Sequence, residues 1–360
     1  RWGKWGTDMG ERIVVTGGRP RNGSGKIPAA KNSVLPLFAA SLLCTGEVRL
    51  QAVPRLADVE HCMALLRGVG CAARWEGSDA VLSGPPANST LPGQTAGQMR
   101  ASILFCAPLL ARLGRAETSL PGGCRIGARP IDLHLYALKR LGASFFEAGG
   151  MILARADRLR GARIRFSYPS VGATENAILA AVTAEGETEI ENCAREPEIM
   201  ELCRFLAAMG ARIRGAGKSR IAVEGVRRLY PAEFFLGGDR ICAGTYLAAA
   251  AMTAGDVTVM GAEPEDLREP VYILRRMGAD ISIKEREKEI RLRMDQRPGP
   301  VSIWTGPDAG LPTDLQSGCL TAASVACVES RITEAVFEAR FAAAALMRQF
   351  GARIRTEGQT

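Results

Sequence analysis

Residues 119–130, SLPGGCRIGARP, place one cysteine in a glycine-rich segment next to positive charge. Cys124 directly follows two glycines, and Arg125 and Arg129 stand one and five positions after it. A thiol gains reactivity when nearby cations stabilise its thiolate form. An isolated cysteine is more commonly a buried structural residue. Both a reactive and a structural thiol therefore stay open for Cys124 at this point.

Other polar side chains stand at the first residues of strongly apolar segments. Lys31 and Asn32 begin the run KNSVLPLFAASLL, and Arg100 begins RASILFCAPLL. A lysine at a helix N-terminus opposes the helix dipole, so an anionic neighbour would explain Lys31. Arg100 and Arg129 favour the same interpretation, with a surface ion pair as the alternative. Asp314, in LPTDLQSG, fits either an N-cap or first-turn acid of a helix, or a general base.

Three other kinds of site are not expected. His61 and His134 are the only histidines and stand far apart, which argues against a catalytic triad or a metal cluster, although His134 closely follows the cysteine loop. The segment NGSGKIP fails the P-loop pattern, because Pro20 replaces its glycine and Ile27 its Ser or Thr. The ten cysteines include no CxxC pair, which favours a reducing, cytoplasmic location over a disulfide scaffold. We expect no metal and no cofactor.

A repeated unit must position these side chains. Five segments each read as a short strand, a turn, an amphipathic helix, a glycine and a second strand. Between each helix and the following strand the backbone must take the left-handed conformation, which glycine adopts without a side-chain penalty. These glycines are Gly70, Gly142, Gly210, Gly278 and Gly351. The distance from the start of the strand to the shared glycine is longer in the second unit than in the others, and the extra residues lie in the Cys124 loop. This favours a flexible loop with a reactive thiol.

A second helix, apolar nearly all round, precedes each unit and should be buried. Only the first residues of these helices are polar, so we expect the N-termini of the helices to line one shared cleft. Helix N-termini and cations would make such a cleft favour anions. The polar starts are Lys31 and Asn32, Arg100, Thr174 and Glu175, Asp239 and Arg240, and Thr313 and Asp314.

The length of 360 residues predicts two domains. Three units per domain would be symmetric, so five units predict that a sixth, of about 65–70 residues, is missing after Thr360. A chain ending there should expose apolar faces. Residues 1–8, RWGKWGTD, lack the apolar core of a secretory signal and are interpreted as vector-derived.

The composition limits the partners. The formal net charge of +8 is spread along the chain, and only four Trp and five Tyr are present. Nucleic-acid binding calls for a concentrated basic patch with aromatic residues, so small anionic substrates are the better interpretation. No apolar run approaches the roughly 20 residues of a membrane span. The oligomeric state is not predicted.

The motifs AAKNSVLP, MRASILF, PGGCRIGARPIDLH, SVGATENAILAA, AREPEI, LPTDLQ and VFEARF occur in this order between Ile13 and Thr360. Together they resemble the UDP-N-acetylglucosamine 1-carboxyvinyltransferase family of enolpyruvyl transferases. The resemblance implies an α/β fold of two inverse α/β barrel domains, each built from three βαβαββ-like units. It implies domain ranges of 31–237 for the domain with the cysteine loop, and 9–30 plus 238–360 for the second, truncated domain.

The same resemblance implies an activity. The enzyme would transfer the enolpyruvyl group of phosphoenolpyruvate to the 3-hydroxyl of UDP-N-acetylglucosamine and release phosphate, which is the first committed step of peptidoglycan synthesis. Two alternatives stay open. One is a catalytically silent paralogue or fragment that binds a UDP-sugar, and the other is an enolpyruvyl transferase acting on shikimate 3-phosphate.

The resemblance also implies residue roles. Cys124 would take part in phosphoenolpyruvate binding and be alkylated by epoxides such as fosfomycin. Lys31, Arg100 and Arg129 would hold the substrate anions, and Asn32 and Asp314 would contact the sugar, with Asp314 near the attacking hydroxyl. Further substrate contacts are implied for Pro130, Asp132, Leu133, His134, Ser170, Val171, Gly172, Thr313, Phe337 and Arg340. Four positions depart from the family pattern, namely Ala30, Tyr168, Cys242 and Ala339.

Overall fold

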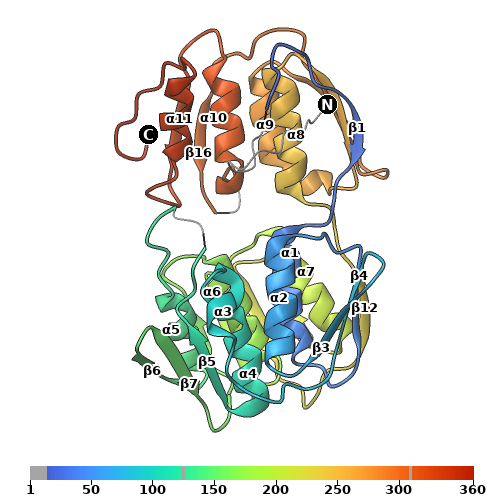
Figure 1. Cartoon of the computed structure of the whole chain (residues 1–360), viewed down its shortest axis with the longest axis vertical. Coiled ribbons are helices and arrows are strands. Elements are labelled where there is room, and N and C mark those ends of the chain that lie inside the picture. The colour runs from blue at the N-terminus through green and yellow to red at the C-terminus, as the bar shows by residue number, and fades with distance from the viewer. Residues whose placement is uncertain (1–13, 124–125, 308–309) are drawn as a thin grey trace, which may run out of the picture.

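The computed structural model describes residues 14–123, 126–307 and 310–360. The molecule has two halves arranged along its longest axis (Figure 1), and each has its own hydrophobic core. The larger core runs from Ala29 to Leu236, and the second combines Ile27 with residues from Ala243 to Ala344. We propose that these cores belong to the two domains predicted above. The predictions for residues 1–8 and for Cys124 lie outside the described residues.

The α-helices are α1 (Lys31–Ser41), α2 (Ala57–Gly68), α3 (Gly93–Ala96), α4 (Cys106–Leu113), α5 (Asp132–Arg140), α6 (Val171–Ala181), α7 (Pro197–Ala208), α8 (Arg240–Met252), α9 (Arg268–Arg276), α10 (Gln316–Ser324) and α11 (Ala342–Gln349). Three 3-10 helices are η1 (Arg100–Phe105), η2 (Pro264–Leu267) and η3 (Thr313–Leu315). The strands are β1 (Asn22–Lys26), β2 (Val48–Gln51), β3 (Ala72–Glu76), β4 (Asp79–Ser83), β5 (Arg115–Ser119), β6 (Ser144–Ala148), β7 (Met151–Arg155), β8 (Arg163–Arg165), β9 (Glu187–Glu191), β10 (Arg212–Arg214), β11 (Arg220–Glu224), β12 (Ala232–Phe235), β13 (Asp256–Met260), β14 (Asp280–Lys284), β15 (Glu289–Arg293), β16 (Ser302–Thr305) and β17 (Arg331–Glu334).

Four of the predicted units share one sheet topology. In each, the strand before the amphipathic helix and the strand after it both pair antiparallel with a third strand, giving the orders β2-β4-β3, β5-β7-β6, β9-β11-β10 and β13-β15-β14. In three of them a further strand pairs in parallel with the first strand of the unit, namely β12 with β2, β8 with β9 and β1 with β13. β1 and β13 are far apart in the sequence. The five unit glycines have φ between 90° and 102°, which confirms the left-handed residue expected after each helix.

The fifth unit departs from the prediction. Residues 352–356, after Gly351, form no strand. A strand requires a hydrogen-bonded neighbour, and in the other units that neighbour is the following strand of a hairpin. In the described part of the chain, β17 pairs only with β16, so residues 352–356 have no such partner.

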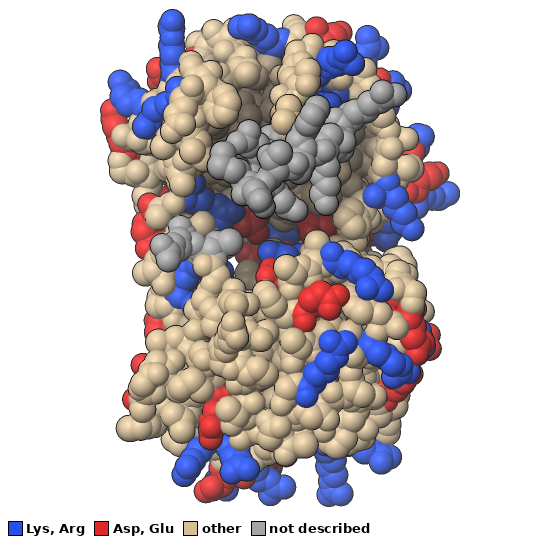
Figure 2. All heavy atoms as spheres, in the orientation of Figure 1, with Lys and Arg blue, Asp and Glu red and all other residues tan. Residues whose placement is uncertain are grey.

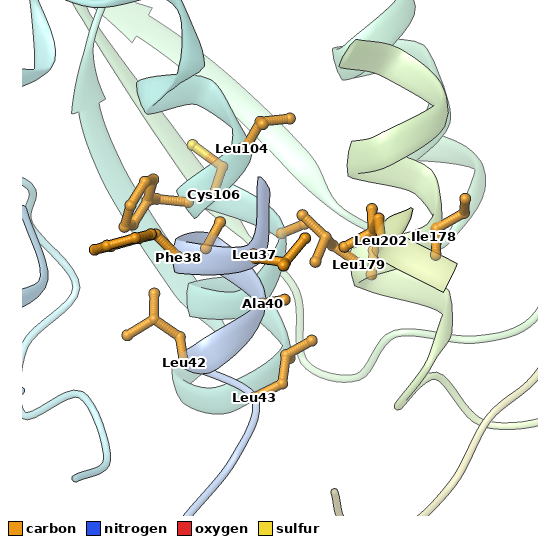
Figure 3. Packing of buried hydrophobic residues seen from close by; sticks show 14 of the residues in the cluster. Leu37, Phe38, Ala40, Leu42, Leu43, Leu104, Cys106, Ile178, Leu179 and Leu202 are labelled. Atoms are coloured by element: carbon orange, nitrogen blue, oxygen red, sulfur yellow. The ribbon is translucent and has the colours of Figure 1, made fainter. Parts of the chain in front are cut away.

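The apolar inner helices form the centre of each half. In the larger core, η1, α4 and α6 pack together, with α1 against η1 and α7. Figure 3 shows side chains of α1, among them Leu37 and Phe38, lying among residues of η1, α4, α6 and α7. In the other half α8 packs against α10, and it leaves Thr245 and Tyr246 exposed, so the expectation of complete burial is wrong for α8. The inner helix of the second unit begins as the 3-10 helix η1 and continues as α4.

The chain crosses between the halves twice, and the two crossings lie side by side. Ala30 N donates to Gly237 O at 3.0 Å, and Asp239 N donates to Pro28 O at 2.8 Å. The two segments therefore form a short antiparallel connection, visible in Figure 1 between β1 and α1.

Candidate active site

A cleft of about 1660 Å³ lies between the two halves. Its lining includes every predicted site residue except Cys124, which lies outside the described residues. Gly123 and Ile126, the described residues on either side of the gap, also line it. The predicted residues brought together are Lys31, Asn32, Arg100, Arg129, Pro130, Asp132, Leu133, His134, Ser170, Val171, Gly172, Thr313, Asp314, Phe337 and Arg340. The expectation that the inner helices open on one cleft is confirmed except at Thr174 and Asp239, which do not line it.

Asp314 connects the two halves across this cleft. Its Oδ2 accepts from Asn32 Nδ2 at 3.2 Å, and its Oδ1 accepts from Arg340 Nη2 at 2.7 Å. It makes no capping hydrogen bond, since the residue before η3 is Pro312. Asp314 is therefore an acid in the first turn of η3 and not its N-cap, and its carboxylate is held in the cleft by one amide and one guanidinium group.

Lys31 lies at the N-terminus of α1, as the sequence indicated. Its Nζ lies 3.3 Å from Asp58 Oδ2, so a protein carboxylate supplies at least part of the expected anionic neighbour. Its backbone N donates to Asp239 Oδ2 at 3.2 Å, and the other oxygen of Asp239 caps α8. One carboxylate thus joins the first helix of each half at its N-terminus.

Arg100 and Arg129 form the positive part of the cleft. Arg100 Nη2 donates to Pro130 O at 2.7 Å, which brings η1 to the end of the cysteine loop. A Cβ at Gly123 would lie 3.3 Å from Arg100 N and 3.8 Å from Arg129 Nη1, so the backbone before Cys124 lies against both residues. Burial, and then the charge of Arg129, lower the pKa of Arg100 to about 10. A bound anion would relieve this repulsion.

The glycines before Cys124 have a packing reason. A Cβ on Gly122 would lie 1.9 Å from Gly97 O, so only glycine allows this close approach of two backbones. Gly123 has φ of 106°, in the left-handed region. The start of the cysteine loop is therefore fixed against the residues that precede η1.

The other end of the cysteine loop contacts the opposite half. Ala128 N donates to Glu338 Oε1 at 2.7 Å, and Ala339 N donates to Ile126 O at 3.1 Å. The hydrogen bond from Ala128 lowers the pKa of Glu338. Sequence reasoning missed Glu338, although it lies within the VFEARF motif.

Phe337 lies between two cations. The guanidinium carbons of Arg129 and Arg340 lie 5.6 and 5.7 Å from the centre of its ring. Both distances suit a cation–π interaction. Phe337 therefore joins the arginine of the cysteine loop to the arginine that holds Asp314.

The N-terminus of α6 faces the same cleft. Ser170 caps the helix through its hydroxyl, which accepts from Ala173 N at 3.4 Å. A Cβ on Gly172 would lie 2.9 Å from a carbon of the His134 ring, so the imidazole lies directly against this helix start. Burial, and then the charge of Arg100, lower the pKa of His134 to about 3. His134 is therefore a neutral group, suited to hydrogen bonding and not to charge pairing.

The cleft carries side chains of both charges. Among the described lining residues, acidic side chains outnumber basic ones, and Figure 2 shows both kinds in the hollow between the halves. Most of the cations are neutralised locally, in the pairs Lys31–Asp58, Arg240–Glu198, Arg268–Glu265 and Arg340–Asp314. The sequence identified Lys31, Arg240 and Arg340 as polar residues of the cleft but did not predict these ion pairs.

Carboxyl groups gather on the side of the cleft near the crossover. Burial is the first cause that raises the pKa of Glu175 well above its ordinary value, followed by the charges of Glu198 and Glu196. Burial also raises the pKa of Asp266 to about 6. Glu198 is paired with Arg240 at 3.1 Å, and both side chains are largely buried. On this side of the cleft, Glu175 and Asp266 therefore keep a proton to higher pH than an ordinary carboxyl group does.

The four positions that depart from the family pattern all lie at or near the cleft. Tyr168 lines it, and burial raises the pKa of its phenol. Ala30 precedes α1, Cys242 N donates to Asp239 Oδ1, and Ala339 contacts the cysteine loop through its backbone. The backbone contacts of these last three do not depend on the side chain.

The described residues contain no group of three or more His, Cys, Asp or Glu side chains placed to hold a metal ion. All nine cysteines among them are free. A search of the same residues finds no helix with the length and apolar character that crossing a membrane requires.

Comparison with known proteins agrees with this architecture. The sequence model of the family described as EPSP synthase (3-phosphoshikimate 1-carboxyvinyltransferase) matches residues 15–360. The UDP-N-acetylglucosamine 1-carboxyvinyltransferase of Nocardia farcinica is 45% identical, over 97% of this chain and 83% of that protein. The protein of the same name from Mycolicibacterium paratuberculosis is 43% identical, over 97% and 84%.

Solved structures show the same fold. The enolpyruvyl transferase NikO from Streptomyces tendae superimposes with a TM-score of 0.85 at 21% sequence identity, covering 95% of this chain and 81% of that chain. EPSP synthase from Acinetobacter baumannii gives a TM-score of 0.68 at 19% identity, covering 89% and 75%. The predicted α/β enolpyruvyl transferase fold is thereby confirmed, and the sequence relatives show that the chain belongs to the UDP-N-acetylglucosamine 1-carboxyvinyltransferases within the EPSP synthase family.

Proposed function

We propose that this protein transfers the enolpyruvyl group of phosphoenolpyruvate to the 3-hydroxyl of UDP-N-acetylglucosamine and releases inorganic phosphate. The family membership supports the reaction type, and the cleft supports the substrate class. The observation that carries the proposal is the placement of Asp314 opposite the Arg100 and Arg129 pair in one cleft between the halves.

The reaction needs a base, a proton donor and fixed positive charge. The 3-hydroxyl oxygen adds to C2 of phosphoenolpyruvate while C3 gains a proton, and this forms a tetrahedral intermediate. Phosphate then leaves from C2 as C3 loses a proton, which restores the double bond. Asp314 is the base in this proposal, because its carboxylate faces the cleft and Arg340 holds it in place.

Phosphoenolpyruvate would lie at Arg100 and Arg129, with Lys31 nearby. An anion with several charges suits this part of the cleft, because Arg100 and Arg129 lie close enough for their charges to interact and both can donate to it. Cys124 lies outside the described residues, but Gly123 lies against both arginines. We therefore keep Cys124 as the thiol that acts at phosphoenolpyruvate.

The UDP part would lie along the start of α6 and the segment from Pro130 to His134. Phosphate oxygens suit a helix N-terminus, where backbone N–H groups are free to donate. Ser170, Val171 and Gly172 supply that terminus, and His134 lies beside it as a neutral ring.

The test is a phosphate-release assay with phosphoenolpyruvate and each of two acceptors, UDP-N-acetylglucosamine and shikimate 3-phosphate. Release only with the UDP-sugar is the expected result. Release with shikimate 3-phosphate would favour the sister activity, and no release with UDP-sugar binding retained would favour a silent paralogue. Incubation with fosfomycin followed by peptide mass spectrometry should place the adduct on Cys124, and an adduct elsewhere would contradict that assignment.

We also propose that the reaction takes place in the cytoplasm as the first committed step of peptidoglycan synthesis. The free cysteines of the described residues are consistent with a reducing compartment. The names of the sequence relatives support the place in cell-wall synthesis.

A further inference from the structure

We propose that Glu334 is a positioning residue that sets the geometry of Asp314 and Arg340. The inference rests on the proposed function, in which Asp314 is the base. The sequence motifs did not indicate Glu334, because it lies before VFEARF and outside that motif. It does not line the cleft.

Glu334 is a fully buried carboxylate at the end of β17. Its Oε1 accepts from Thr313 Oγ1 at 3.0 Å, from Val336 N at 2.9 Å and from Phe337 N at 3.1 Å. Its Oε2 accepts from Thr313 Oγ1 at 2.9 Å. Burial of a carboxylate is costly unless hydrogen bonds satisfy it, and here three donors do so.

These donors come from the two segments that carry the cleft residues. Thr313 directly precedes Asp314 at the start of η3, and Phe337 stands three residues before Arg340. Glu334 is thus the common acceptor that joins the two segments behind the Asp314–Arg340 ion pair, whose atoms lie 2.7 Å apart. Without Glu334, the segment that carries Asp314 and the segment that carries Arg340 would each lose the hydrogen bonds that hold them from behind the cleft.

The same contact changes the interpretation of Thr313. The sequence resemblance implied a substrate contact, but the hydroxyl proton of Thr313 is donated to Glu334. In this proposal Thr313 acts with Glu334 to position Asp314.

The first test compares Glu334→Ala, Glu334→Gln and Thr313→Val with the control Glu329→Gln, an exposed carboxylate in the same part of the chain. A misplacement of about 1 Å at a reacting group can cost about 100-fold in rate, so kcat should fall about 100-fold in Glu334→Ala. The amide oxygen of Glu334→Gln can accept the same hydrogen bonds, so that variant should stay within about 10-fold of wild type. KM for phosphoenolpyruvate should change much less than kcat, because Arg100 and Arg129 are kept and only Phe337 links Arg129 to Glu334 among the contacts described above.

A purely structural role would give a different result. In that case the variants would lose unfolding free energy but keep kcat once folded, and such an outcome would overturn the proposal. If Glu334→Ala does not fold, Thr313→Val with an unchanged kcat would overturn it equally. The double variant Thr313→Val/Glu334→Gln should be no slower than the slower single variant, because both act through one contact.

A second test does not depend on activity. The coupling between Asp314 and Arg340 is measured by urea unfolding of Asp314→Asn, Arg340→Gln and the double variant, in the wild-type and Thr313→Val backgrounds. We expect the coupling to be present in the first and reduced in the second. Equal coupling in both would overturn the positioning role, whereas a wild-type protein without phosphate release would contradict only the proposed function.

Discussion

Ala128 N donates a hydrogen bond of 2.7 Å to Glu338 Oε1, and this bond joins the cysteine loop of one half to the other half. A hydrogen bond to an ionised acceptor is stronger than one between neutral groups. Replacement of Glu338 by Ala should therefore lower kcat/KM by about 10-fold or more, because the loop loses its contact across the cleft.

Glu338→Gln is the matched variant, because its amide oxygen can still accept from Ala128 N. It should keep most of the activity in a steady-state phosphate assay. Equal loss in Glu338→Ala and Glu338→Gln would show that the negative charge, and not the hydrogen bond, is what matters.

Gly122 should not tolerate any side chain. A Cβ there would lie 1.9 Å from Gly97 O, so Gly122→Ala must displace the start of the cysteine loop. We expect kcat/KM to fall by about 100-fold and the labelling of Cys124 by fosfomycin to slow. Gly25→Ala is the control, since a Cβ at Gly25 meets no atom within 4 Å. Labelling of Gly122→Ala at the wild-type rate would contradict this account of the loop.

Arg100 should act on phosphoenolpyruvate more than on the UDP-sugar. Arg100→Gln removes one cation of the positive part of the cleft and should lower kcat/KM for phosphoenolpyruvate by about 100-fold. The affinity for UDP-N-acetylglucosamine, measured by calorimetry, should change by less than about 3-fold. The exposed Arg115→Gln serves as the control. A loss confined to UDP-sugar binding would assign Arg100 to the other substrate.

Asp266 should make stability depend on pH. Burial raises its pKa from 3.8 to about 6 in the folded protein, so the folded state binds a proton more tightly than the unfolded state. The contribution of Asp266 is therefore present at about pH 4 and is lost as pH rises through about 6. Relative to Asp266→Asn, the wild-type protein should lose about 1 kcal/mol of unfolding free energy over this range, after allowance for solvent screening.

Urea unfolding of both proteins across this range measures the difference directly. The exposed Glu287→Gln should follow the wild-type curve. Parallel curves for wild type and Asp266→Asn would contradict the raised pKa.

The repeat explains why much of the fold could be predicted. Five glycines at equivalent positions indicated where each amphipathic helix ends, and all five are left-handed. Continuous apolar runs predicted the inner helices, because a helix that is buried on all sides is apolar all round. The pattern was misleading after Gly351, because alternation in ARIRT indicates a strand but does not supply the hydrogen-bonded neighbour that a strand needs.

The site was less predictable than the fold. Motifs and helix starts identified residues that do meet in one cleft, such as Lys31, Arg100 and Asp314. The carboxylates Asp58 and Glu198, which pair with Lys31 and Arg240, were missed, because each lies far along the chain from its partner and only folding brings the two together. Glu334 and Glu338 were missed for a related reason, since their roles depend on backbone donors brought close only by folding.

The paired crossing segments near Ala30 and Gly237 determine how the two halves can move. Because two hydrogen bonds tie the crossing segments together, we expect them to act as one hinge and not as two independent links. Relative motion should then be a rotation about one line, and the same pairs of residues would meet each time the halves approach. A bound substrate would then favour the closed arrangement of the two halves over the open one. A single rotation would bring the two surfaces together in the correct alignment.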